Sequence, residues 1–122
     1  MSSTRLIALL ALAFIVAGCD DTVKSAYPTK SDASKDDLFK RGWLPEIIPD
    51  SSRDLVVEND LDLDISDGSF AFDSTDYEAF IGQMTRVPGK DEGGTEAYQF
   101  EEWFFWIDDS RERCRYRFEL TR

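Results

Sequence analysis

The stretch FEEWFFWIDDSRERCRYRFEL, residues 100–120, decides the fold that we predict for this chain. Two runs rich in aromatic and apolar residues, at 100–107 and 113–120, flank the polar segment 108–111. Such a pattern is typical of a β-hairpin. With an even-length loop, we expect the cross-strand pairs Ile107–Glu112, Trp106–Arg113, Phe105–Cys114, Phe104–Arg115 and Trp103–Tyr116.

Residues 42–72 predict an irregular arm followed by further strands. Pro45 and Pro49 rule out a long regular element, so we expect the arm to lay Trp43, Leu44, Ile47 and Ile48 on the domain. A strand is predicted around residues 54–58. The alternation of leucine and aspartate over 59–65 predicts a half-buried strand, Asp67-Gly68 a turn, and residues 69–72 the next strand.

A helix is expected between these strands and the hairpin. Thr75 and Glu78 have the spacing of a capping box, and Tyr77, Phe80, Ile81 and Met84 follow at helical spacing. Residues 86–97 contain Pro88, Gly89, Gly93 and Gly94 and are predicted to form a loop. The predicted fold is α+β, a small antiparallel sheet of about five strands with one packed helix in the order β-β-β-α-β-β.

The N-terminus has the order of a secretory signal: Arg5, the apolar run Leu6–Ala17, and small residues. This run is shorter than the roughly 20 residues of a spanning helix. Val16-Ala17-Gly18-Cys19 resembles the box of bacterial lipoproteins at all four positions. The resemblance implies cleavage of residues 1–18 and attachment of diacylglycerol to Cys19. Asp20 and Asp21 resemble the signal that retains lipoproteins in the inner membrane, so that membrane is favoured over the outer one.

Two further segments complete the predicted organisation. Residues 19–37, in which Ser, Asp, Lys and Thr predominate, are predicted to be the lipidated N-terminus and a flexible tether. Residues 38–122 are predicted to form a single head domain. Within it, Gly42–Pro45 and Ile48-Pro49 with the following strand resemble the head domain of YbbD-like membrane-bound lipoproteins, over about residues 42–57. The resemblance implies a lipid-anchored head and brings no catalytic residues.

Charge and composition narrow the function. The net charge is −11, which disfavours binding to nucleic acid, and the chain has no histidine. We predict no catalytic residues, no metal site and no cofactor. Asp60, Asp62 and Asp64 have calcium-loop spacing, but Ile65 and Ala71 stand where such a loop needs Gly and Glu, so a solvated strand face is favoured.

The outer side of the hairpin is the candidate partner-binding face, because guanidinium groups beside aromatic rings are common in interfaces. It consists of Phe104, Trp106, Arg113, Arg115 and Arg117. The competing interpretation is that the arm or the helix covers this face. We expect a non-catalytic, lipid-anchored envelope protein, facing the periplasm and binding another envelope protein. The alternative is an acidic inhibitor or immunity lipoprotein that blocks a basic envelope hydrolase.

The lipid anchor gives the first prediction. Replacing Cys19 by Ser removes the thiol that would carry the acyl chains, and two or more chains give stable anchoring at about 0.8 kcal/mol per buried CH₂. The Cys19→Ser variant is therefore expected in the soluble fraction after cell fractionation, with the unchanged protein in the membrane fraction. Membrane retention of the variant contradicts the anchor.

Overall fold

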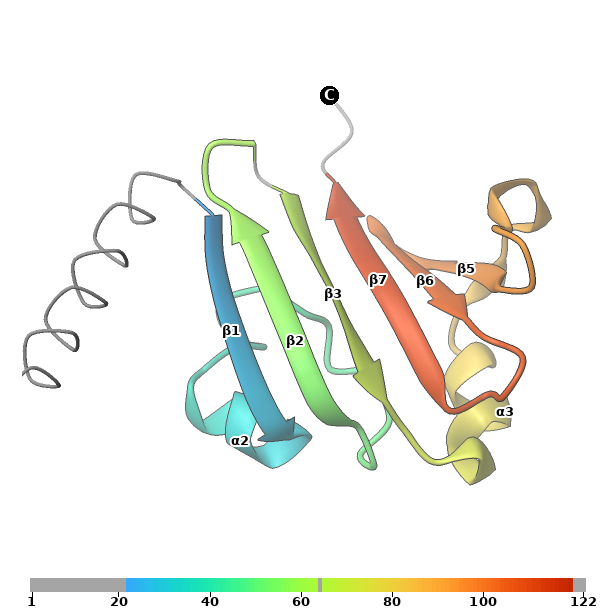
Figure 1. Ribbon diagram of the computed structural model, residues 1–122, viewed down its shortest axis with the longest axis horizontal. Coiled ribbons are helices and arrows are strands. Elements are labelled where there is room, and N and C mark those ends of the chain that lie inside the picture. The colour runs from blue at the N-terminus through green and yellow to red at the C-terminus, as the bar shows by residue number, and fades with distance from the viewer. Residues whose placement is uncertain (1–21, 64, 120–122) are drawn as a thin grey trace, which may run out of the picture.

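Figure 1 shows the computed structural model, which describes residues 22–63 and 65–119. Seven strands form one sheet: β1 (Thr22–Thr29), β2 (Arg53–Asp60), β3 (Ile65–Ala71), β4 (Thr85–Arg86), β5 (Glu96–Phe100), β6 (Trp103–Ile107) and β7 (Arg113–Glu119). Two short α-helices, α2 (Lys30–Lys35) and α3 (Tyr77–Ile81), and the 3-10 turns Ser74–Asp76 and Pro88–Lys90 complete the described elements. None of the helices in this described part is long and apolar enough to cross a membrane.

The sheet is antiparallel throughout, with the strand order β1-β2-β3-β7-β6-β5-β4. The sheet consists of two sets of strands, β1-β2-β3 and β4-β5-β6-β7, and within each set strands that are consecutive in the sequence pair with each other. The pairing of β3 with β7, from Ile65–Glu119 to Ala71–Arg113, joins the two sets. The sheet therefore depends on one contact between segments that are far apart in the sequence.

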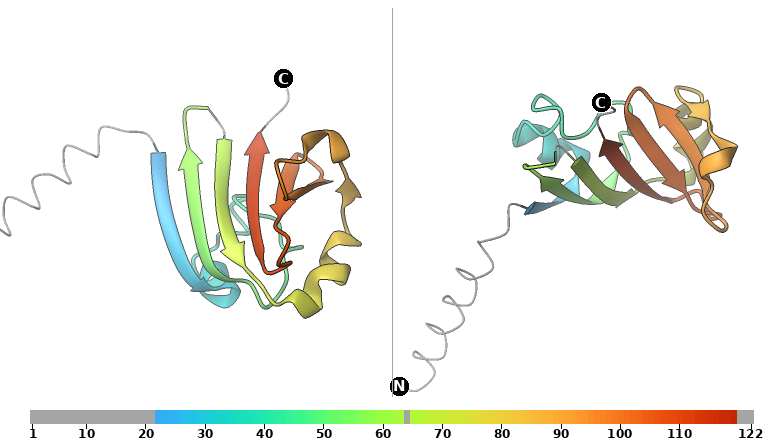
Figure 2. Two further views of the ribbon diagram at one scale, coloured as in Figure 1. Left: turned by 45° about the vertical axis from the view of Figure 1, so that its right-hand side comes forward. Right: turned by 90° about the horizontal axis from the view of Figure 1, so that it is seen from above.

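One face of the sheet, here called the inner face, is buried. A row of directly paired residues crosses it: Val57, Gly68, Tyr116, Phe105 and Tyr98. In Figure 2, α2 and the arm, residues 36–52, lie stacked against the sheet. The segments outside the sheet contribute Ala33, Leu38, Leu44, Ile48, Tyr77 and Phe80 to the same core cluster as the inner-face residues.

The opposite face, here called the outer face, is accessible over most of its area. Two rows of paired residues cross it. The first is Ala26, Val56, Ser69, Arg115, Trp106 and Ala97, and the second is Lys24, Glu58, Asp67, Arg117, Phe104 and Gln99. Trp106 and Ala97 are buried, whereas the others are partly or fully exposed.

The predicted antiparallel sheet with a packed helix is confirmed, but the sheet has seven strands rather than five. The predicted strand over residues 59–65 is wrong: β2 ends at Asp60, residues 61–63 form a turn, and β3 begins at Ile65. The Asp60 carboxylate accepts the backbone N–H groups of Asp62 and Leu63, at 3.1 and 3.2 Å, and so closes this turn. Asp67-Gly68, predicted to be a turn, lies inside β3.

The predicted tether is wrong for residues 22–37. Strand β1 pairs with β2 from Thr22–Asp60 to Thr29–Arg53, and α2 follows directly. Thr29 caps α2 by accepting the Asp32 N–H, and Ala33 is fully buried. The polar composition misled the prediction because an edge strand needs few apolar side chains when backbone hydrogen bonds hold it to its neighbour. The described fold thus already includes residues 22–37, which the prediction had left outside the head domain.

The helix and the loop after it also differ from the prediction. Instead of about ten helical residues, a 3-10 turn leads into the five residues of α3, and no side chain caps either. The apolar spacing was nevertheless informative, since Tyr77 and Phe80 are buried in the core. Residues 86–97 contain the start of β5, which turns into β6 through Glu101-Glu102, with φ +53° at Glu101.

The last hairpin forms with a register shifted by two residues from the predicted one. Its pairs are Ile107–Cys114, Trp106–Arg115, Phe105–Tyr116, Phe104–Arg117 and Trp103–Phe118. A shift of two keeps every side chain on its predicted face, because strand side chains alternate with a period of two residues. The arm is as expected: Leu44 and Ile48 are buried, and Trp43 and Ile47 pack against the core.

Gly68 gives a stability prediction. An added Cβ there would lie 1.9 Å from the Val56 carbonyl oxygen and 2.9 Å from the Tyr116 hydroxyl oxygen. Gly68→Ala is therefore expected to lower the free energy of unfolding by about 1–3 kcal/mol or more, measured by urea denaturation. Gly89→Ala is the control, because nothing lies within 4 Å of its added Cβ. Equal stability of the two variants contradicts the packing of Tyr116 on β3.

Candidate functional site on the outer face

The candidate face from the sequence is assembled on β6 and β7. Phe104 pairs with Arg117, and Trp106 pairs with Arg115. Arg113, which pairs with Ala71 of β3, projects to the same side by strand alternation. Arg113 and Arg115 are exposed, and Phe104 and Arg117 are partly exposed. These residues, with Trp106, are called the arginine–aromatic strip below.

The strip is held together by contacts between cations and rings. The Arg115 guanidinium carbon lies 4.4 Å from the Trp106 ring centroid, and the Lys90 ammonium nitrogen lies 4.5 Å from the Phe104 centroid. The two rings are 6.2 Å apart. Each such cation–ring contact contributes about 0.5–1 kcal/mol at an exposed site. The strip is thus a rigid patch that presents charge over aromatic carbon.

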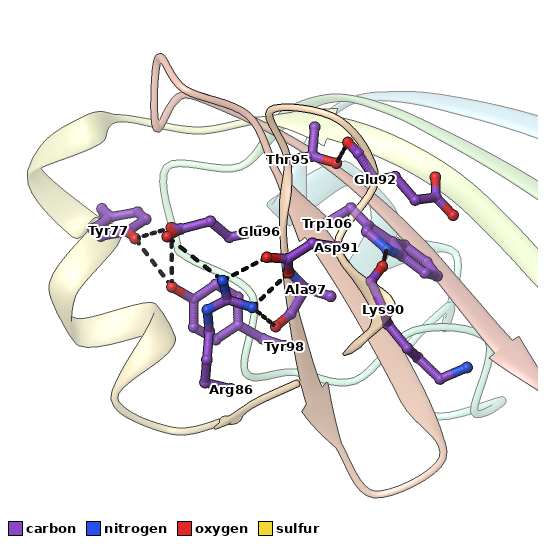
Figure 3. Close-up of polar contacts among 10 residues, drawn as sticks. All are labelled: Tyr77, Arg86, Lys90, Asp91, Glu92, Thr95, Glu96, Ala97, Tyr98 and Trp106. Carbon is purple, nitrogen blue, oxygen red and sulfur yellow. Dashed lines mark hydrogen bonds and ion pairs between the residues drawn. The ribbon is translucent and has the colours of Figure 1, made fainter. Parts of the chain in front are cut away.

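Trp106 is not available to a partner in this arrangement, since only 7% of its surface is exposed. The competing interpretation, that the arm or the helix covers this face, is wrong: Trp106 is covered by the loop 87–95 between β4 and β5, which we call the lid loop. The Trp106 Nε1–H donates to the Lys90 carbonyl at 2.9 Å, as Figure 3 shows, and Glu92 pairs with Arg115.

A bidentate ion pair anchors the lid loop to the sheet. Arg86 donates to both carboxylate oxygens of Asp91, at 2.5 and 2.7 Å, and Asp91 also accepts the Ala97 N–H at 2.8 Å. The hydrogen bonds from Arg86 are the main reason that the pKa of Asp91 lies below its ordinary value, and the pKa of Arg86 is correspondingly raised. Sequence reasoning missed this pair, because nothing in the sequence indicates that two residues five positions apart in a predicted loop are in contact.

Arg86 also joins a tyrosine cluster that connects α3 with β5 (Figure 3). Its guanidinium carbon lies 5.5 Å from the Tyr98 ring centroid, and Glu96 accepts from Tyr77 at 2.9 Å and from Tyr98 at 3.2 Å. Burial is the largest cause that raises the pKa of Tyr77, followed by its hydrogen bonds with Tyr98 and Glu96. Tyr77 therefore stays protonated and acts as a hydrogen-bond donor.

A polar pocket of about 320 Å³ lies beside this cluster. It is lined by Arg86, Asp91, Gly93, Gly94, Thr95, Glu96, Asp108, Asp109 and Arg111. Arg86 is engaged by Asp91, and the Arg111 guanidinium carbon lies 4.4 Å from the Tyr77 ring centroid. The cations of this pocket thus already have partners, so we assign it a structural role in fixing the lid loop.

Two other side chains that could react, the Cys114 thiol and the Asp60 carboxylate, lie in environments that do not favour a reaction. Burial raises the pKa of the Cys114 thiol well above its usual value, which keeps it protonated and a poor nucleophile. Asp60 serves the β2–β3 turn as described. Over residues 22–63 and 65–119, no group of three or more Cys, His, Asp or Glu side chains is arranged to hold a metal ion.

The half of the outer face formed by β1, β2 and β3 carries no strip of this kind. A shallow apolar hollow of about 370 Å³ is lined by Ala26, Tyr27, Pro28, Asp54 and Val56. A second hollow, of about 400 Å³, has a mixed polar and apolar lining that runs from Val56 to Arg115 and Arg117 of the strip. Sequence reasoning missed this area because it had assigned β1 to the tether.

Residues 21–71 match the family model described as the YbbD head domain. The match confirms the resemblance seen at residues 42–57, which lie within it. It ends at Ala71, the last residue of β3, so the YbbD head segment comprises β1, α2, the arm, β2 and β3. The match indicates an envelope-associated protein, and the arginine–aromatic strip lies outside it. Searches of curated proteins and of solved structures return no match.

The predicted signal peptide, its cleavage box Val16, Ala17 and Gly18, and the predicted lipid attachment at Cys19 lie outside the described residues. They stay predictions from the sequence. The same holds for Asp20 and Asp21 as a membrane-sorting signal.

The Arg86–Asp91 pair predicts an acid-sensitive lid loop. Because the pKa of Asp91 is lowered in the fold, its contribution is complete above the ordinary value of about 3.9 and is lost as the pH falls through the lower folded value. Asp91→Asn is expected to raise hydrogen exchange of the Trp106 indole N–H several-fold at neutral pH, measured by NMR. Asp54→Asn, a change at an exposed residue of β2 on the other side of the sheet from the lid loop's strands, serves as control, and equal exchange in both variants refutes the anchoring role.

Proposed function

We propose that this chain is a lipid-anchored protein of the bacterial envelope whose non-catalytic head binds another envelope protein through the arginine–aromatic strip. The anchor is Cys19, the head faces the periplasm, and Asp20 and Asp21 favour the inner membrane. The YbbD head segment supports the envelope assignment. The arrangement of the covering segments supports the binding surface, as follows.

One observation carries the choice of surface. The covering segments α2, the arm and α3 pack their apolar residues into the core on the inner face. The outer face keeps Arg113 and Arg115 exposed on the strand that pairs with partly exposed Phe104, in a chain whose net charge is −11. A cationic, aromatic patch on an acidic protein suits a partner surface that carries carboxylates.

The chemistry of the described residues supports a binding role over catalysis. Enzymes that use acid–base or nucleophilic chemistry need a group with a suitable pKa next to the reacting atoms. The groups with shifted pKa values here either hold the lid loop, as Asp91 does, or are sealed in the core, as Cys114 is. Their environments fit structural roles.

An inhibitor or immunity lipoprotein directed against a basic envelope hydrolase is the second candidate. The observation in its favour is the β2–β3 turn, which projects Leu61 and Leu63 into solvent next to acidic Asp60 and Asp62. An acidic projection of this kind suits a basic cleft. In that case, the complex depends on the turn rather than on the strip, and its association rate falls with salt.

A charge reversal on the strip tests the first proposal. Arg113 is exposed and on the outer face, so Arg113→Glu is expected to keep the fold and to weaken partner binding about tenfold, or about 1.4 kcal/mol. Lys40→Glu, an exposed reversal in the arm, is the matched control. Both variants are compared with the unchanged chain by affinity capture of tagged, full-length protein from crosslinked, detergent-solubilised envelopes, with quantitative mass spectrometry.

The outcomes separate the two candidates. Loss of one stoichiometric partner in Arg113→Glu, but not in Lys40→Glu, supports the strip. A basic hydrolase that both variants capture, and that high salt removes, supports the inhibitor. Capture that is no better than that of the mislocalised Cys19→Ser protein contradicts both.

A further inference from the structure

The exposed large hydrophobic residues of the described chain gather at one end of the sheet. They are Val23, Leu61 and Leu63, with 48%, 52% and 64% of their surfaces exposed. Leu61 and Leu63 lie on either side of Asp62 in the β2–β3 turn. Val23 pairs with Asn59, the penultimate residue of β2. We call these three residues the apolar tip.

The apolar tip lies at the end of the sheet where the chain enters it. Figure 1 shows the start of β1 and the β2–β3 turn side by side at the same end, and Thr22 pairs with Asp60 directly beneath the turn. Neighbouring strands are about 4.8 Å apart, so the tip and the start of β1 are close neighbours. The β6–β7 turn, residues 108–112, lies at the other end.

The covalent chain limits how far this end can be from the lipid. Cys19 is three residues before Thr22, and a fully extended chain spans at most about 3.6 Å per residue, or roughly 11 Å in total. Strand β1 alone, with eight residues, is about 26 Å long. An acylated Cys19 therefore holds the start of β1, and with it the apolar tip, near the bilayer, whereas it sets no such limit on the far end of the sheet.

We propose that the apolar tip docks the head end-on onto the surface of the membrane that holds its anchor, with Leu61 and Leu63 in the interfacial layer of the lipid. This inference rests on the proposed lipidation of Cys19. The Asp60 carboxylate accepts the N–H groups of Asp62 and Leu63 and so fixes the turn that carries the two exposed leucines. Acidic residues next to the tip favour zwitterionic over anionic headgroups.

End-on docking explains features that are otherwise unconnected. Exposed leucines in a short turn are unfavourable in water, and apolar side chains gain free energy when they enter the headgroup–acyl boundary. The sheet then stands upright on the membrane. Its outer face points sideways, where the arginine–aromatic strip is accessible to a neighbouring envelope protein.

The test uses full-length, lipidated protein in phosphatidylcholine vesicles. An environment-sensitive fluorophore is attached at Leu63→Cys and, as matched control, at Asp109→Cys in the far turn. Buried Cys114 is expected to take up no label, which the unchanged protein checks. Docking predicts blue-shifted emission at position 63, with quenching by spin-labelled lipid at least threefold stronger than at position 109. Equal quenching by aqueous iodide at both positions overturns the proposal.

A second variant excludes an effect of the fluorophore itself. The label is placed at Val23→Cys, with Leu61 and Leu63 either kept or both changed to Ser; both side chains are exposed, so the fold should be retained. Docking predicts that the lipid quenching at position 23 falls at least threefold in the double-Ser protein. Quenching that does not change with the leucines contradicts their role.

Flotation of the vesicles separates this inference from the proposed anchor. If the full-length protein fails to float with vesicles, the lipid anchor is wrong and docking falls with it. If it floats while position 63 stays open to iodide, only docking is wrong. Shielding from iodide without lipid quenching means that protein, such as a second copy or a hydrolase, covers the tip, and this too overturns membrane docking.

Discussion

The pairing of β3 with β7 is the contact on which the rest of the structure depends. It joins a three-stranded unit, which coincides with the YbbD head segment, to the four strands that follow α3. At its centre Gly68 lies opposite Tyr116, whose ring packs with Phe70, Trp103 and Phe105. A side chain at residue 68 would push these rings away from β3, so this close approach fixes how the two halves share one core.

The two faces of the sheet differ: the inner face is buried in the core, and the outer face is largely accessible. Short segments cover the inner face, and because α2 and α3 have only six and five residues, their stability comes from packing rather than from helix formation. The lid loop covers one corner of the outer face, where Arg86 and Asp91 hold it over Trp106. The remaining outer face and the apolar tip stay open, and both proposals concern these two surfaces.

The parts of the fold that side-chain pattern alone determines could be predicted from the sequence. The aromatic hairpin, the strand at 54–58 and the buried residues of the arm and α3 have strong periodicity or unmistakable bulk. The faces of Phe104, Trp106 and the arginines followed correctly, because an error of two residues in register does not change a face. That the strip lies beside the lid loop could not be predicted, since it depends on an ion pair within a loop.

The sequence pattern did not reveal where the backbone pairs to form the edge of the sheet and where it turns. Residues 22–37 have the composition of a tether, yet β1 is an edge strand that needs hydrogen bonds to β2 more than apolar side chains. The alternating leucines at 61 and 63 predict a half-buried strand, whereas they lie in an exposed turn closed by Asp60. Strand β1 begins three residues after Cys19, so the proposed anchor at Cys19 would be joined to the sheet through a short length of chain.

The central claim is therefore that β1 belongs to the sheet, and hydrogen–deuterium exchange of the full-length protein tests it most directly. The account predicts that peptides covering residues 22–37 are protected from exchange alongside those of β2 and β3. Complete exchange of residues 22–37 within seconds, while residues 53–119 stay protected, would contradict it. The segment would then be a tether, and the head would be free to move away from the membrane.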